Sequence, residues 1–163
     1  MKYKIIIVAI LILMGNQKTF SQNVYIRGKI IDYETNYAIH AVTIVPDSLP
    51  NGALSDMNGN FDIKGNTRKL ELSFVGYYPI RFINIPVEKK HIDFGNIKMV
   101  ANHLGEDVAT GKPYTISEQS KEEDKRLRKN VLKKYRIKVC GKKLKPYFEG
   151  NKLIFDFNKN GGK

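Results

Sequence analysis

Hydrophobic and polar residues alternate in short runs through residues 22–100. In the run 24–31, Val24 and Ile26 fall on one side and polar residues fall on the other. Alternation with a period of two is typical of a half-buried β-strand. The run 41–45 is rich in β-branched residues, which we expect in a strand covered on both faces. Turn residues separate seven runs, which we predict as the strands of a β-sandwich: 24–31, 41–45, 53–57, 60–63, 69–75, 80–85 and 91–99.

Residues 55–63, with the sequence SDMNGNFDI, have two interpretations. Their four acidic or amide side chains carry the oxygen ligands that a calcium ion prefers. An EF-type loop, however, needs glycine at its sixth position and glutamate at its twelfth, and counting from Asp56 these positions hold phenylalanine and threonine. Asn58-Gly59 is a strong signal for a tight turn, because both residues tolerate positive φ. We predict a hairpin between the two flanking strands, with calcium binding as the alternative.

The pattern changes to a helical one in the last third of the chain. Leu127, Val131 and Tyr135 recur at intervals of four, which places them on one narrow apolar stripe of a helix over residues 121–135. Ser120 begins a capping-box pattern just before it. Alternating residues beyond the helix predict two or three short strands, with a hairpin turn at residues 149–151. So few elements cannot bury a large core alone, and whether they dock on the sandwich is left open.

The beginning of the chain has the pattern of a secretory signal peptide. A positive start is followed by an apolar run over residues 5–14, with a cleavage site expected after Ser21 or Gln22. The run is shorter than the ~20 residues of a membrane-spanning helix, although an uncleaved anchor is the alternative. The expected organisation has four parts: a signal peptide (1–21), a sandwich (22–100), a linker (101–119) and a tail (120–163).

Four blocks within residues 24–85 resemble the carboxypeptidase-regulatory-like domain. They are GKIID at 28–32, NYAIHAVT at 36–43, SDMNGNFDI at 55–63 and LELSFVGY at 70–77. The second block departs from the family pattern, since Asn36 and His40 stand where glycines are common. The resemblance implies a mainly β fold, a seven-strand transthyretin-like (prealbumin-like) β-sandwich, here followed by a small basic α+β tail. It also implies an accessory module without catalytic residues, of the kind found beside carboxypeptidase domains, in TonB-dependent receptors and as small exported proteins.

Direct tests for catalytic chemistry find only fragments of motifs. His103 and Glu106 form the first half of a zinc-peptidase pattern, but no histidine follows to complete it. The adjacent carboxylates Glu122, Glu123 and Asp124 are interpreted as residues at the solvated start of the helix, favoured there by the helix dipole. The only cysteine, Cys140, rules out an internal disulfide. We therefore predict a non-enzymatic protein with no cofactor and no metal.

Charge is concentrated in the tail. The whole chain has a formal net charge of +12, and residues 112–163 contain sixteen Lys and Arg against six Asp and Glu. A basic surface of this density attracts polyanions, although lysine-rich faces also serve simply to keep a protein soluble. The candidate polyanion-binding residues are Lys125, Arg126, Arg128, Lys129, Lys133, Lys134, Arg136, Lys142 and Lys143.

These patterns lead to one preferred function and one alternative. We predict a non-enzymatic accessory or binding module of the cell envelope, exported to the periplasm or associated with the outer membrane. The alternative is a protein that binds polyanions or a membrane surface through its basic tail. The expected partner is another envelope protein or an acidic glycan or lipopolysaccharide surface, and nucleic acid is disfavoured because an exported protein rarely meets it. We expect no transmembrane span after signal cleavage.

Overall fold

The first predicted strand lies at the centre of a three-stranded sheet. A computed structural model describes residues 24–49, 51–102 and 118–159 of the chain. Strand β1 (Val24–Asp32) pairs antiparallel with β4 (Asn60–Gly65) and parallel with β7 (His91–Met99), in the order β4-β1-β7. Val24, Ile26 and Ile30 point into the core as predicted, and Tyr25 and Arg27 point outward.

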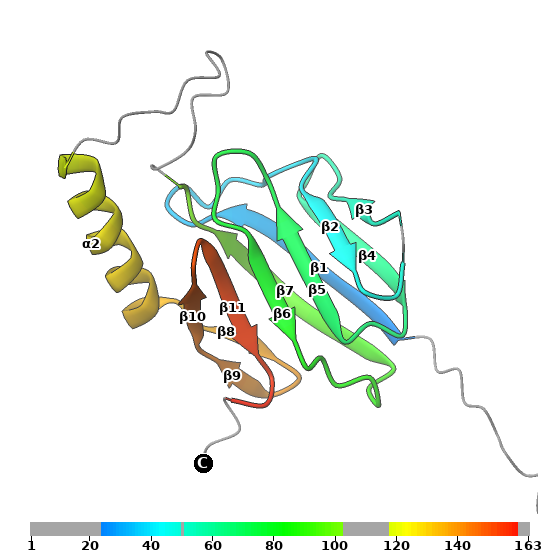
Figure 1. The fold of residues 1–163 in the computed structure, drawn as a ribbon. Helices are drawn as coiled ribbons and strands as arrows, with labels where there is room; N and C mark the ends of the chain where they lie inside the picture. Colours follow the sequence, from blue (N-terminus) through cyan, green and yellow to red (C-terminus); the bar gives the residue numbers. More distant parts are fainter. Residues whose placement is uncertain (1–23, 50, 103–117, 160–163) are drawn as a thin grey trace, which may run out of the picture.

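A six-stranded sheet packs against the first one (Figure 1). Its order is β10-β11-β6-β5-β2-β3, so two strands from the last part of the chain extend the sheet that β2, β3, β5 and β6 begin. Strand β11 pairs parallel with β6 and antiparallel with β10. The bounds are β2 (Thr43–Pro46), β3 (Ala53–Leu54), β5 (Lys69–Ser73), β6 (Ile80–Ile83), β10 (Pro146–Glu149) and β11 (Lys152–Asp156).

The core between the two sheets is built around aromatic rings. The Phe82 ring centroid lies 4.4 Å from that of Phe94 in the smaller sheet and 5.2 Å from that of Phe155 in strand β11. All three side chains are fully buried. Burial of a large aromatic side chain contributes strongly to stability, so strand β11 from the tail stabilises the same core as strands β6 and β7.

The tail docks on the sandwich, which settles the point that the sequence left open. Helix α2 (Glu118–Lys134) is followed by β8 (Ile137–Val139) and β9 (Lys142–Leu144), which pair with each other. Val131 and Tyr135 are buried in the common core, and the Tyr135 ring packs edge-on against Phe155. The Tyr135 hydroxyl also accepts a hydrogen bond of 2.6 Å from the backbone N–H of Lys98 in β7. Burial raises the pKa of this phenol, so the hydroxyl stays protonated.

Two expectations about the start of helix α2 are corrected. The helix begins at Glu118 instead of 121, so Ser120 lies inside it and does not cap it. Asp124 is not on a solvated face, because its side chain is only 7% exposed and accepts hydrogen bonds from Tyr78 and Arg128. The sequence placed Asp124 with its two acidic neighbours, but in the helix it lies on the same side as Val131, facing the sandwich.

The turn at residues 56–59 is confirmed, but the hairpin is not. Gly59 has a φ of 75°, and a Cβ atom there would lie 2.3 Å from the carbonyl oxygen of Ile30. The Asp56 carboxylate accepts hydrogen bonds from the backbone N–H groups of Asn58 and Asn60. The strands on either side do not form a pair, because β3 belongs to the larger sheet and β4 to the smaller one. The stretch is therefore a crossing between the two sheets.

Other strand expectations are confirmed or corrected at their edges. The predicted strand 53–57 is reduced to two residues, Ala53–Leu54. Strand β2 alternates between exposed and buried positions, so it is covered on one face only. The predicted hairpin of the tail is confirmed, since Glu149 pairs with Lys152 across a two-residue turn.

Some predictions concern residues outside the described ranges. These are the signal peptide at 1–21, most of the linker 101–119, and the pair His103 and Glu106.

Candidate functional site

The outer face of the smaller sheet carries three rows of polar side chains. The rows follow from strand register, because residues opposite one another on paired strands lie side by side on one face. Each row takes one residue from β4, one from β1 and one from β7: Lys64, Tyr25 and His91; Asp62, Arg27 and Asp93; Asn60, Lys29 and Asn96. These nine side chains are outside the core, so they are available to form a surface.

A β-bulge in β7 shapes this face. Asp93 is opposite Arg27, but Asn96 is opposite Lys29, so β7 has one residue more than β1 over this interval. Gly95 takes up the extra residue with a φ of 59°, a conformation that suits glycine. The bulge turns Asn96 outward while Ile97 stays in the core. Because Gly95 has no side chain, the surface between Asp93 and Asn96 is hollow.

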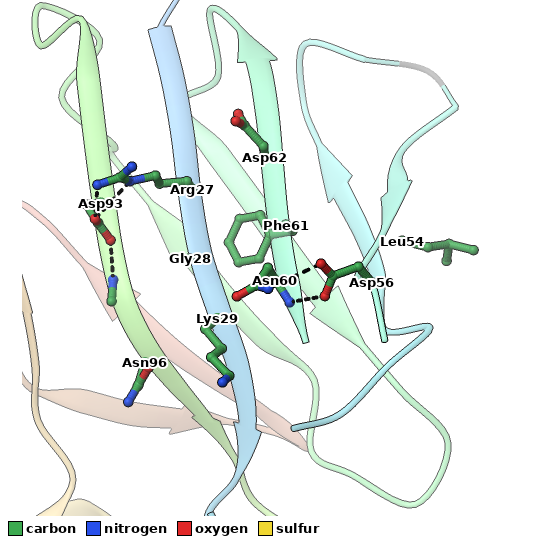
Figure 2. A pocket seen from close by; sticks show the side chains of 11 residues that line it. Arg27, Gly28, Lys29, Leu54, Asp56, Asn60, Phe61, Asp62, Asp93 and Asn96 are labelled. Atoms are coloured by element: carbon green, nitrogen blue, oxygen red, sulfur yellow. Dashed lines mark hydrogen bonds and ion pairs between the residues drawn. The ribbon is translucent and has the colours of Figure 1, made fainter. Parts of the chain in front are cut away.

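The result is a depression of about 620 Å³ on the sheet face (Figure 2). Gly28 and Gly95 lie at its centre, the Phe61 ring packs beneath Gly28 on the core side of the sheet, and the polar side chains form its walls. The ring lies against Gly28 so closely that a Cβ atom there would be 2.9 Å from Phe61 Cε1. A smaller hollow of about 340 Å³ adjoins it and shares Arg27 as well as both carboxylates of the middle row. A concave surface with several convergent polar groups is a common construction of a ligand site.

Hydrogen bonds hold the walls in place. Arg27 donates from Nε to Asp93 Oδ2 at 2.9 Å, and the Gly95 N–H donates to Asp93 Oδ1 at 2.8 Å. The Gly95 hydrogen bond, with Arg27 beside it, lowers the pKa of Asp93. At the other side, the Asn60 N–H bond lowers the pKa of Asp56. Both carboxylates are therefore ionised at neutral pH and act as hydrogen-bond acceptors.

The chemistry of the depression is that of binding. In the part of the chain that the structure describes, no group of three or more His, Cys, Asp or Glu side chains is placed to hold a metal. Asp56 uses its carboxylate oxygens to organise the turn at 56–59. What the walls offer is a set of exposed hydrogen-bond donors and acceptors at fixed positions. No helix in the described ranges is long and apolar enough to cross a membrane.

In the structure, two of the predicted basic residues bind other groups of the protein and the others lie at exposed positions. Arg128 is directed inward, where it pairs with Asp124 and donates to the Gly150 carbonyl and the Asn151 side chain. Arg136 donates to the carbonyl groups that end helix α2. The remaining members lie at exposed positions of α2 or β9: Lys125, Arg126, Lys129, Lys133, Lys134, Lys142 and Lys143. Lys125 among these pairs with Glu122 at 3.5 Å.

The depression was missed by reasoning from the sequence alone. Its residues are polar positions of predicted strands, and Tyr25, Arg27 and Lys29 were recognisable as the outward side of the first run. Their neighbours come from β7, which begins 59 residues after β1 ends. A parallel pairing over that separation, with a bulge inside it, has no signal in a single sequence.

Comparison with known proteins gives the family. The fold is mainly β, and one sheet face is hollow and polar. The sequence model of the family described as CarboxypepD_reg-like domain matches residues 26–109, just over half of the chain. The chain belongs to this family, which confirms the resemblance seen in the four sequence blocks. The domain is a regulatory, non-catalytic one.

Solved structures show only distant likenesses. A 9R-lipoxygenase from Cyanothece is 13% identical with a TM-score of 0.35, over 58% of this chain and 20% of that one. A protein from Bacteroides fragilis, described as membrane-associated and of unknown function, is 15% identical with a TM-score of 0.36, over 76% of this chain and 58% of that one. The chain thus spans less than two thirds of either protein. No curated protein matches it.

Proposed function

We propose that this protein is a non-catalytic binding module exported to the cell envelope, with a transthyretin-like sandwich that presents its ligand site on the outer face of the β4-β1-β7 sheet. Three observations support the proposal. The family is a regulatory one without catalytic activity of its own. The first 21 residues have the pattern of a signal peptide. The sheet face is hollowed where an ordinary solvated face would be flat.

The depression at the β7 bulge carries the proposal. Bulges redirect side chains, and they occur preferentially at strand edges and beside functional sites. Here the bulge and Gly95 leave the centre of the face without a side chain and with polar groups around it. The interior contacts of Phe61 require a glycine only at position 28. The glycine at position 95 is not required by packing in the core, so the opening there belongs to the outer surface.

Site-specific photocrosslinking in the native cells tests the proposal. A photoreactive amino acid at position 96 stands at the wall of the depression, and the same residue at position 43 stands on the outer face of the other sheet as a control. We expect a crosslinked envelope component at position 96 and none at position 43. Equal labelling at the two positions, or a protein confined to the cytoplasmic fraction, would contradict the proposal.

A second candidate function, binding of polyanions, rests on the exposed face of helix α2. With Arg128 and Arg136 engaged internally, Arg126, Lys129 and Lys133 still lie at exposed positions of the helix. Several cations on one helix face create a local field that attracts phosphate or sulfate groups of a lipopolysaccharide or acidic glycan. The cations of helix α2 are not part of the depression, so substitutions can test the two functions separately.

Two variants that lose the same number of charges at different places distinguish a polyanion site from a general effect of net charge. We expect K129Q/K133Q/K134Q to elute from immobilised heparin at clearly lower salt than the wild type, because exposed charges act over about 10 Å at 0.1 M salt. The matched variant K69Q/K89Q/K90Q loses the same three charges at exposed positions outside the helix. Equal elution of the two variants would show that heparin responds only to net charge, and would remove α2 as a site.

A further inference from the structure

The charge pattern and hydrogen-bonding groups of the depression identify the class of its ligand. We propose that the depression binds a segment of an uncharged, hydroxyl-rich glycan. This inference rests on the proposed function, since it names the ligand of the same site. It differs from the sequence-based expectation, which was an acidic glycan held by the basic tail.

Positive and negative side chains nearly balance on this face, unlike in the chain as a whole. Two cations and three carboxylates line the depression, and Lys64 adds a third cation on the same face, whereas the whole chain has a formal net charge of +12. The members are Arg27, Lys29, Lys64, Asp56, Asp62 and Asp93. Opposite charges that alternate at short range cancel each other's field at the distance of a ligand, so the face has no strong preference for either sign.

Arg27 is placed where it disfavours an anionic ligand. It lies between Asp62 on β4 and Asp93 on β7, and its guanidinium is already hydrogen-bonded to Asp93. A phosphate or uronate that approached Arg27 would meet both carboxylates, and like charges held close together are repelled. A cationic ligand would meet Arg27 and Lys29 in the same way. A neutral polar ligand avoids both penalties.

The side chains around the depression match the hydrogen bonding of sugar hydroxyls. A hydroxyl group both donates and accepts, and the walls offer carboxylate acceptors beside amide, guanidinium and ammonium donors. Asp62 and Asn96 stand at opposite sides of the depression in Figure 2, with Lys29 between them along β1. Rows two residues apart are separated by about 7 Å, so the two rows at the depression together with the adjoining row span about 13 Å, the scale of a short oligosaccharide.

An exposed aliphatic side chain at the rim supplies the apolar contact that a sugar ring needs. Leu54 is 63% exposed there, beside the polar walls, whereas the Phe61 ring is buried beneath Gly28 in the core. The aromatic pair in the next row is not the platform, because Lys64 covers one face of the Tyr25 ring and His91 covers the other. The carbon–hydrogen face of a sugar therefore has its apolar partner at Leu54.

An extended peptide is a poorer occupant. Peptides that bind sheets do so by adding a strand at an open edge, where backbone groups are unpaired. The depression lies over β1, whose backbone pairs on one side with β4 and on the other with β7. A peptide there would have to rely on side-chain contacts alone.

Nuclear magnetic resonance titration of the full mature chain tests the proposal. The probes are a panel of neutral tetrasaccharides (linear gluco-, xylo-, manno- and galacto-oligosaccharides), each added up to roughly ten millimolar, with tetragalacturonate as the acidic comparison. We expect at least one neutral probe to shift backbone amide signals of β1, β4 and β7, and the acidic probe to bind there at least about tenfold more weakly.

Variants then assign the effect to the depression. Asp62→Ala and Asn96→Ala remove exposed wall groups, and each should weaken binding of the neutral probe by about tenfold, the effect of losing a hydrogen bond to a polar ligand. Thr43→Ala, on the outer face of the other sheet, should leave it unchanged, and thermal melts confirm that all three variants are folded.

The alternative outcomes contradict the inference in distinguishable ways. No response of the three strands to any neutral probe overturns it, and so does a preference for tetragalacturonate at this face. If photocrosslinking at position 96 captures a protein while no neutral probe binds, the binding-module function stands and the glycan ligand is wrong. If neither experiment labels the face, both proposals fail.

Discussion

A chain that ends at Asn102 should not form a stable fold. The truncation removes β11, the hydrogen-bonding partner of β6, and with it the Phe155 ring that packs on Phe82. Loss of one such buried aromatic ring costs about 3–5 kcal/mol. The total stability of a domain of this size is only about 5–15 kcal/mol. Because helix α2 and the β10-β11 hairpin are lost as well, we expect no cooperative unfolding transition.

Circular dichroism melts and binding of a hydrophobic dye measure this effect. We expect the truncated chain to melt without a sharp transition and to bind the dye strongly, since Tyr78 and Phe82 become accessible. As a control, residues 118–159 are added as a separate polypeptide and should restore a cooperative melt. This result would show that the truncated chain lacks the contacts of the tail and is not irreversibly misfolded. A sharp melt of the truncated chain at a temperature near that of the full chain would refute the prediction.

Local patterns along the chain located most of the strands within residues 24–99. Val24 and Ile26 alternate with polar neighbours because strand geometry itself has a period of two, and the same is true of Leu70 and Leu72. The turn at Gly59 was recognisable because few residues other than glycine adopt its backbone conformation. Both signals depend only on neighbours within a few residues.

Long-range pairing accounts for what the sequence did not reveal. The parallel contact of β11 with β6 joins residues about 70 apart, and it makes the tail part of the larger sheet. The contact of β7 with β1 assembles the depression from three separate segments. Register at such separations is decided by the packing of the whole core, so no local pattern predicts it.

Arg128 lies at a different kind of position from the exposed one that counting charges along the sequence suggests. In the sequence it is one of a dense series of cations and carries no local mark of burial. In the structure its guanidinium carbon lies 4.8 Å from the centre of the Tyr78 ring and 4.7 Å from that of Phe148. Asp124, which the sequence grouped with exposed carboxylates, is its partner at 2.8 Å. A planar cation that packs against two aromatic rings and pairs with a buried carboxylate holds helix α2 on the sandwich.

Replacement of Arg128 by methionine should therefore destabilise the protein far more than the same change at any exposed cation of the helix. The substitution keeps an apolar side chain of similar length but leaves Asp124 buried without its cation. Breaking a buried pair costs about 3–5 kcal/mol, and since the Arg128 side chain is 23% exposed we expect about 2–3 kcal/mol. Lys125→Met in the same helix is the matched control, because its pair with Glu122 is exposed, and it should cost less than about 0.5 kcal/mol.

A double-mutant cycle with Asp124→Asn attributes the loss to the pair itself. Asparagine keeps the shape and a hydrogen-bond acceptor for the Tyr78 hydroxyl, while it removes the buried charge. The double variant R128M/D124N should therefore be more stable than R128M alone, with a coupling energy of about 1–2 kcal/mol measured by urea unfolding. If R128M unfolds at the same urea concentration as K125M, Arg128 does not anchor the helix and belongs instead with the exposed cations available to a polyanion.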